Sequence, residues 1–312
     1  MLRMGPLPPP AELGEGLEGA PVELVFIIEQ VLNGLVVSAY YLLIALGLSL
    51  IFSLGGVVNL AHGAFYALGA YLAIEIERRL GFGGAFVLSP ILVALLGVAL
   101  ERTMLRRFYR SDPILSLLLT FGLAMVIEQV IRIVWGASPL PFQIPPYLKG
   151  QLFLGDFIYS YYRLAMLGVA TTAVVLTWLL FNKTSFGRVV RAGVQNPDMV
   201  AVLGISLAPV MTIVVAIGIG LAGLAGVLLA PIAGVHPAMG TEIITAAFVV
   251  VVIGGLGSFW GVVLAALLVG VVRGLAVYFI PPAAEASMYL LMLLVLLLRP
   301  RGLLGERIQK FE

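Results

Sequence analysis

The chain has 312 residues, of which 61% are hydrophobic and 11% are charged, with a net charge of +2. Soluble domains carry about 25% charged residues, so a soluble fold of this size would expose too much apolar surface to water. These figures exclude a soluble enzyme, a nucleic-acid-binding protein, a secreted disulfide scaffold and a disordered protein. Because one membrane-crossing helix needs about 20 apolar residues, the composition predicts an all-α polytopic membrane protein with about eight to ten transmembrane helices.

The chain divides into one large apolar domain and two short polar ends. Residues 1–23 are rich in Pro and Glu and lack the basic-then-apolar order of a secretory signal, so the first span is expected to be retained. A single transmembrane domain covers 24–305, and 306–312 form a tail. Apolar stretches predict spans near 24–46, 48–74, 85–101, 114–134, 163–182, 207–231, 243–257, 259–280 and 284–299.

Polar residues lie at the start of the first predicted span and near the end of the 114–134 span. Glu29, Gln30 and Asn33 cluster at the start of the first span and suggest an outer vestibule. Further along, Glu128 and Arg132 stand four residues apart on a predicted helix, a spacing that allows them to pair along one face.

A glycine-broken segment lies at 47–73 and places an amide and an imidazole among apolar residues. Irregular backbone at membrane depth is tolerated only where it is buried in protein or faces a wet cavity. We therefore expect the segment to line a translocation pathway through Gly55, Gly56, Asn59, His62 and Gly63. The alternative is structural: Asn59 caps a broken helix end and His62 packs in the interior.

The loops differ strongly in positive charge. Counted over nine spans, eleven Lys and Arg residues fall on one face, in 101–113, 183–205 and the C-terminal tail, and five fall on the other. Because Lys and Arg accumulate in cytoplasmic loops, the eleven-charge face is expected to be cytoplasmic, and the C-terminus with it. The expected location is the inner (plasma) membrane.

The cytoplasmic segment 183–205 contains a predicted docking helix. Asn196 is a favoured N-cap, Pro197 suits the first helical position, and Asp198 suits the positive end of the helix dipole. Gly204 is a natural stop. Between them, Met199, Val202 and Leu203 form one apolar stripe, which either enters a groove of a partner or packs on the bundle itself.

A second glycine-broken segment lies at 249–270, in the other half of the chain. Paired interruptions of this kind point to the pathway of a transporter, with broken or re-entrant helices and a possible inverted repeat. The predicted pathway residues here are Gly254, Gly255, Gly257 and Ser258. Arg273 lies within a later predicted span, and the sequence assigns it no role.

The sequence predicts neither an enzyme nor a cofactor or metal site. The chain has no cysteine, and its two histidines, His62 and His236, lie far apart. It contains no glycine-rich phosphate loop ending in Gly-Lys-Ser/Thr, since Asn182 precedes Lys183-Thr184. A transporter with this sequence must take its energy from another subunit.

Several motifs together resemble LivH-type permeases of branched-chain amino acid ABC importers. They are the 47–73 run with Asn59-Leu60-Ala61-His62-Gly63, the Thr120–Leu123 stretch, Gly254–Ser258 and the terminal Leu298–Gly305. The 183–205 loop is similar to the conserved cytoplasmic loop of importer permeases, with Asp198 at the same spacing from Gly204 but without its two small residues.

The resemblance covers about 25–305 and implies a set of partners. These are a second, LivM-like permease, two ABC ATPase subunits, an external substrate-binding protein and the lipid bilayer. It implies transport of Leu, Ile and Val by alternating access. Two alternatives stay open: a permease for urea or short amides, and an ion-coupled secondary transporter, which would need a charged relay at mid-membrane.

Overall fold

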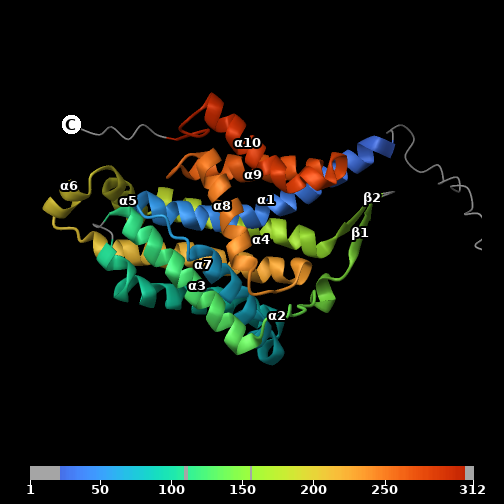
Figure 1. Ribbon diagram of the computed structural model, residues 1–312, viewed down its shortest axis with the longest axis horizontal. Helices are drawn as coiled ribbons and strands as arrows, with labels where there is room; N and C mark the ends of the chain where they lie inside the picture. Colours follow the sequence, from blue (N-terminus) through green and yellow to red (C-terminus); the bar gives the residue numbers. More distant parts are fainter. Residues whose placement is uncertain (1–21, 109–111, 155–156, 306–312) are drawn as a thin grey trace, which may run out of the picture.

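The computed structural model describes residues 22–108, 112–154 and 157–305 (Figure 1). The helices are α1 (Val22–Gly55), α2 (His62–Thr103), α3 (Pro113–Trp135), α4 (Tyr161–Lys183), α5 (Ser185–Gln195), α6 (Pro197–Val202), α7 (Leu207–Ala233), α8 (Met239–Gly254), α9 (Phe259–Phe279) and α10 (Ala284–Leu298). The predicted all-α membrane fold is confirmed. Residues 1–21 of the predicted N-terminal segment and the predicted tail at 306–312 lie outside the described residues.

The number of crossing segments agrees with the expected eight to ten. Seven helices in the described part of the chain are long and apolar enough to cross a membrane. One of them, α2, bends at Gly81, whose φ of 71° is open to glycine and unfavourable for other residues. Counting its two limbs separately and adding the shorter α8 gives nine apolar segments among the described residues.

The predicted boundary between the first two spans is wrong. The sequence suggested a break between 46 and 48, whereas α1 continues as one helix to Gly55. Gly47 explains the difference, because it lets another helix approach rather than ending its own. A Cβ on Gly218 of α7 would lie 2.7 Å from the Gly47 carbonyl oxygen, so the two backbones touch where both side chains are absent.

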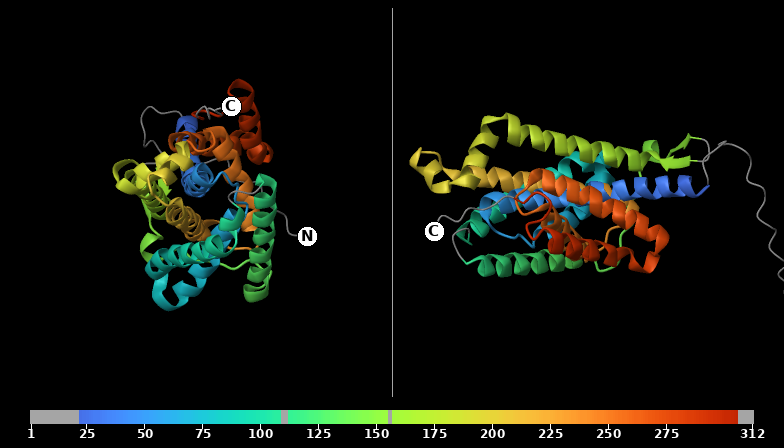
Figure 2. Two further views of the ribbon diagram at one scale, coloured as in Figure 1. Left: turned by 90° about the vertical axis from the view of Figure 1, so that its left-hand side faces the viewer. Right: turned by 90° about the horizontal axis from the view of Figure 1, so that it is seen from above.

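Helices α1 and α7 form the centre of the bundle. In α1, 83% of the most apolar window is buried inside the protein, against 28% in α3, which lies at the periphery. Helix α2 packs mainly on α7, and α1 packs on both α7 and α9. Figure 2, seen from one end, shows the other helices gathered around α1. The peripheral helices carry the exposed apolar side chains that lipid or a partner subunit would cover.

The bundle has two unlike ends, which we call the hairpin end and the α6 end. At the hairpin end, strands β1 (Gln151–Leu154) and β2 (Phe157–Ser160) pair antiparallel, with Gln151 opposite Ser160 (Figure 1). The Tyr159 hydroxyl donates to the Leu32 carbonyl oxygen at 3.1 Å and fixes the hairpin to α1. The opposite end carries α5 and α6, together with the described residues of the three positively charged segments.

Candidate functional site

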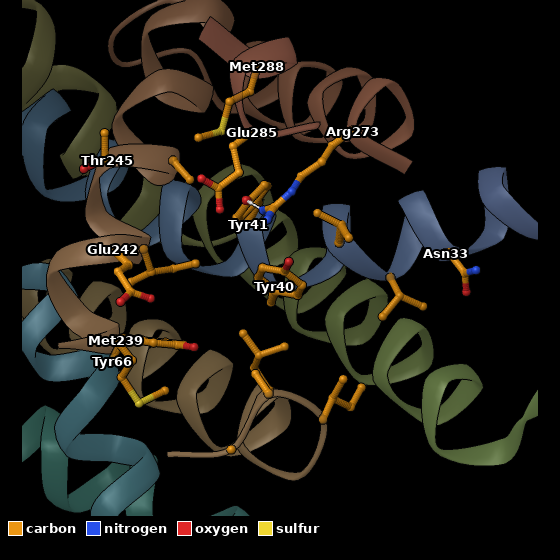
Figure 3. A pocket seen from close by; sticks show the side chains of 18 of the residues that line it. Asn33, Tyr40, Tyr41, Tyr66, Met239, Glu242, Thr245, Arg273, Glu285 and Met288 are labelled. Atoms are coloured by element: carbon orange, nitrogen blue, oxygen red, sulfur yellow. Dashed lines mark hydrogen bonds between the residues drawn. The ribbon is translucent and has the colours of Figure 1, made fainter. Parts of the chain in front are cut away.

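A cavity of about 800 Å³ lies in the hairpin-end half of the bundle (Figure 3). Its walls come from α1, α2, α4, α7, α8, α9 and α10, so residues 33 to 289 meet around one space. The volume is within the range of about 300–1,000 Å³ that small-molecule sites occupy. No residue between 42 and 65 or between 247 and 272 lines it. The cavity therefore does not extend into the packed layer that includes the fully buried Leu43, Ile44 and Ile253.

Five ionisable residues of both signs line the cavity. They are Arg163, His236, Glu242, Arg273 and Glu285. Ionisable groups within the apolar part of a membrane protein are costly and usually mark a substrate or ion pathway. Tyr40, Tyr41 and Tyr66 add hydroxyl groups, and Asn33 adds an amide.

Three polar contacts organise these groups. The Arg273 guanidinium donates to the Tyr41 hydroxyl and also lies over the Tyr41 ring, 5.7 Å from its centroid. Arg163 donates to the Asn33 side-chain oxygen. His236 Nε2 lies 3.6 Å from Glu242 Oε2. Two of the cavity's cationic groups are thus held by neutral partners and keep their charge available to a bound solute.

The remaining wall is apolar and sits on α1, α8 and α10. Val36 and Val37 contribute from α1, Met239 and Ile243 from α8, and Met288 from α10. Aliphatic and thioether side chains suit a branched hydrocarbon group, because burying that group gains about 25 cal/mol per Å² removed from water. The cavity thus combines apolar surface with charged groups of both signs.

None of the nine predicted pathway residues lines this cavity. Residues 56–61 form a non-helical stretch that turns back from the end of α1 into the bundle. His62 Nε2 lies 3.1 Å from the Ile44 carbonyl oxygen, which is about 16 Å along α1 from Gly55 at 1.5 Å per residue. Because a carbonyl can only accept, Nε2 carries a proton and donates it to Ile44.

The geometry around Asn59 matches the structural alternative. Its Oδ1 accepts from the Ala61 amide at 3.1 Å, immediately before α2 begins. Thr120 of α3 supports the same stretch, since its hydroxyl accepts from the Leu60 amide at 3.2 Å. Gly63 lies against the Gly240 backbone of α8, where a Cβ would clash. Gly55 ends α1, and Gly56 follows it with a φ of 65°. A pathway role for these residues stays a prediction.

The second glycine motif lies at the α6 end, where it joins the C-terminal motif. Gly255 has a φ of 97°, and there is no room for a side chain, because a Cβ there would lie 2.5 Å from the Gly305 nitrogen. The Leu303 amide donates to the Ile253 carbonyl oxygen at 2.7 Å, and the Leu304 amide donates to that of Gly254 at 3.1 Å.

The same turn also contacts the end of α1 and starts the next helix. A Cβ on Gly257 would lie 3.4 Å from that of Ser53. Ser258 caps α9, with its hydroxyl accepting from the Gly261 amide at 3.1 Å. The Gly254–Ser258 turn, the C-terminal motif and the end of α1 therefore pack against one another. Together they form one closed layer at the α6 end of the bundle.

The docking segment has the predicted local structure. Asn196 caps α6, accepting from the Met199 amide at 2.9 Å, and Pro197 and Asp198 occupy its first turn. Gly204 follows the helix with a φ of 77°. The three stripe residues are exposed, Met199 to 57%, Val202 to 81% and Leu203 to 71%. Val200 is buried and fixes the opposite face, so the stripe projects from the protein instead of packing on the bundle.

Two of the sequence's minor expectations are also tested by the structure. Glu128 and Arg132 form an ion pair, with Oε1 and Nη2 2.7 Å apart, as the spacing predicted. Of the suggested vestibule residues, Asn33 lines the cavity, whereas Glu29 and Gln30 do not.

Sequence reasoning missed most of the cavity. It assigned no role to Arg273 and did not single out Tyr40, Tyr41, Glu242 or Glu285. The sequence did contain a signal, because acidic residues are rare inside or at the start of apolar spans, where burying their charge is costly. Glu242 and Glu285 both occupy such positions and therefore needed an explanation. Their convergence depends on helix packing, which the sequence alone does not display.

Comparison with known proteins agrees with this architecture. The family described as "Branched-chain amino acid transport system / permease component" matches residues 30–298. The high-affinity branched-chain amino acid transport system permease protein LivH of Salmonella typhimurium is 28% identical over 91% of this chain and 97% of its own length. Its counterpart BraD of Pseudomonas aeruginosa is 29% identical over the same share of this chain and 97% of its own.

One further permease and one solved structure also match part of the chain. The permease protein LivM of Escherichia coli is 30% identical over 85% of this chain and 67% of its own length. A chain of the structure titled "PsaBC from Streptococcus pneumoniae in complex with Fab" aligns over 85% of this chain and 89% of its own, with 15% identity and a TM-score of 0.46. With the family match spanning nearly all of the helical bundle, the chain belongs to the branched-chain amino acid transport system permease family.

Proposed function

We propose that this chain forms part of the translocation pathway of an ATP-driven importer for branched-chain amino acids. Its assembly contains a second, LivM-like permease, two ABC ATPase subunits and an external substrate-binding protein. The chain supplies no chemistry of its own and works by alternating access. The observation that carries the proposal is the cavity of about 800 Å³, lined by apolar side chains and by charged groups of both signs, in a member of this permease family.

The orientation follows from charge. All eight Lys and Arg residues of the three basic segments that the structure describes lie at the α6 end: Arg102, Arg106, Arg107, Lys183, Arg188, Arg191, Arg299 and Arg301. Positive loops stay in the cytoplasm, so the α6 end and the C-terminus are cytoplasmic and the cavity opens outward. The closed layer of glycine turn and C-terminal motif then separates the cavity from the cytoplasm.

Helix α6 is the coupling element in this proposal. In alternating access, the bundle switches between an outward-open and an inward-open arrangement. An ATPase subunit that closes on its nucleotide can shift this equilibrium only if its contact with the bundle is stronger in one arrangement than in the other. The exposed stripe of Met199, Val202 and Leu203 fits an apolar groove of such a subunit, and the Asn196 cap keeps the short helix formed before docking.

The test is a double substitution, Met199→Glu with Leu203→Glu, in the transporter assembled from all its subunits. Two charges in an apolar groove are expected to lower co-purification of the ATPase subunits and leucine uptake by about tenfold or more. Phe153→Glu is the matched control, because Phe153 is equally exposed (66%) but lies on the hairpin; it should leave ATPase association unchanged. Normal ATPase association and uptake in the double variant would remove the coupling role.

A further inference from the structure

Two opposite charges in the cavity, Arg273 and Glu285, take part in no direct salt bridge among the described residues. Among the described residues, no carboxylate lies within 4 Å of the Arg273 guanidinium, whose hydrogen-bond acceptor is the neutral Tyr41 hydroxyl. Glu285, at the start of α10, makes no salt bridge of 4 Å or less there either, although its charge attracts that of Arg273. Figure 3 shows the Glu285 carboxylate beside the Arg273–Tyr41 pair, with both charged groups directed into the same space.

The other ionisable groups of the cavity do not form such a pair of opposite charges. Glu242 already lies beside His236, and Arg163 bonds to the neutral Asn33 and has no carboxylate within 4 Å among the described residues. A guanidinium offers five N–H donors, of which the Tyr41 hydroxyl takes one. Arg273 thus retains donors for a planar carboxylate, the group that a guanidinium binds best in paired hydrogen bonds.

We propose that Arg273 and Glu285 form a subsite for the zwitterionic head group of an α-amino acid. Arg273, oriented by Tyr41, binds the α-carboxylate, and Glu285 accepts hydrogen bonds from the α-ammonium group. The side chain of the solute then lies against the apolar wall of Val37, Ile243 and Met288. This inference rests on the proposed function and adds the residues that recognise the solute.

The subsite also gives a physical reason for excluding neutral solutes. Urea or a short amide would leave Arg273 and Glu285 facing each other without the charge-assisted hydrogen bonds that a carboxylate and an ammonium group supply to them. A site built for a charged or hydrogen-bonding group rejects analogues that lack it, by factors of about 10⁴ in favourable cases. The pair therefore favours amino acids over the amide alternative that the sequence left open.

The first test is uptake of leucine at subsaturating concentration by the complete transporter in lipid vesicles. Arg273→Gln is expected to lower uptake at least about tenfold, and Glu285→Gln about fivefold. Glu285 is exposed, so its variant tests the subsite even where Arg273→Gln fails to assemble, as judged by co-purification of the subunits. Arg79→Gln, which removes an exposed arginine at the same end of the bundle, is the matched control and should not change uptake. Uptake within twofold of the wild type in both cavity variants overturns the proposal.

The second test measures binding without the external receptor and uses the absence of cysteine from the chain. Thr245→Cys places one thiol at the cavity wall for labelling by a membrane-impermeant maleimide. Leucine should slow labelling severalfold, whereas leucinamide, without the carboxylate, and 4-methylpentanoate, without the ammonium group, should not. Adding Glu285→Gln should abolish the protection by leucine.

The outcomes separate the two levels of inference. Equal protection by leucinamide or 4-methylpentanoate, or protection that survives Glu285→Gln, overturns the subsite while leaving leucine import intact. A wild-type transporter that imports no branched-chain amino acid overturns the proposed function itself, and with it the subsite.

Discussion

The two ends of the bundle use charge in opposite ways. At the α6 end, the basic side chains are exposed around an apolar stripe that points outward. At the hairpin end, charged groups of both signs turn inward around a cavity. An outward apolar stripe suits a macromolecular partner, which can supply a large desolvated surface. Inward charges suit a small solute, which must exchange its hydration shell for contacts with protein groups.

The two ends also differ in how the chain builds them. Helix α6 and its cap come from nine consecutive residues, 196–204, whereas seven helices contribute to the cavity. A substitution at the α6 end should therefore act on one local element, and one in the cavity on a shared space. The following variants sharpen or break this contrast, from the largest expected effect to the smallest.

Gly255→Leu should have the largest effect, because a leucine there would have an unfavourable backbone conformation and would also clash with its neighbours. Its φ of 97° disfavours any side chain, and a Cβ would lie 2.5 Å from the Gly305 nitrogen. Strain and overpacking together predict a loss of about 2–4 kcal/mol in the free energy of unfolding and a block of uptake in the transporter that still assembles. Thermal unfolding and vesicle uptake measure the two effects.

Gly122→Leu is the matched control for that substitution. Gly122 is a helical glycine of α3 with nothing within 4 Å of an added Cβ. It should leave unfolding and uptake nearly unchanged. If Gly255→Leu behaves like Gly122→Leu, the closed layer at the α6 end plays no part in transport.

Asn196→Ala should weaken α6 by removing its cap. The lost acceptor for the Met199 amide costs about 1 kcal/mol of helix stability, and a six-residue helix has few other bonds to maintain it. We expect faster hydrogen exchange at 199–203 and uptake reduced severalfold. Asn196→Asp keeps an acceptor and should restore both; failure to restore them would show that capping is not the function of this side chain.

Tyr41→Phe should reduce uptake about threefold, mainly through a higher KM. The change keeps the ring under the guanidinium and removes only the hydroxyl that Arg273 contacts. Tyr147→Phe, which removes a hydroxyl from an exposed residue of the hairpin end, is the control. A purely structural role for Tyr41 would lower the amount of assembled transporter and leave the KM unchanged.

Arg132→Gln should have the smallest effect. Its partner Glu128 keeps a hydrogen bond from the Thr241 hydroxyl at 3.0 Å, and partly exposed ion pairs contribute about 1 kcal/mol or less. Uptake should stay within about twofold of the wild type. A larger loss would show that the Glu128–Arg132 ion pair is part of the transport cycle.

Sequence reasoning succeeded where the signal was local. The start and stop of α6 follow from Asn196, Pro197 and Gly204, each of which acts on its own backbone. The non-helical stretch before His62 was also predicted from its glycines and polar residues. In both cases, a few neighbouring residues determine the conformation.

The cavity could not be predicted in this way. Tyr41 and Arg273 are separated by 232 positions, and only the packing of α1 on α9 brings them together. The same limit explains the boundary error at Gly47, which looks like a helix break in the sequence but provides a close contact with α7. Whether a glycine ends a helix or admits a neighbour depends on what lies opposite.

The stretch at 56–61 has a consequence for how the protein is made. Two of its backbone groups rely on Thr120, whose hydroxyl accepts from the Leu60 amide and lies 3.3 Å from the Val58 carbonyl oxygen. Lipid offers no substitute for those hydrogen bonds. The stretch therefore cannot settle when the ribosome has delivered only the first two helices. We therefore expect it to take up its final position only once the third helix has been inserted.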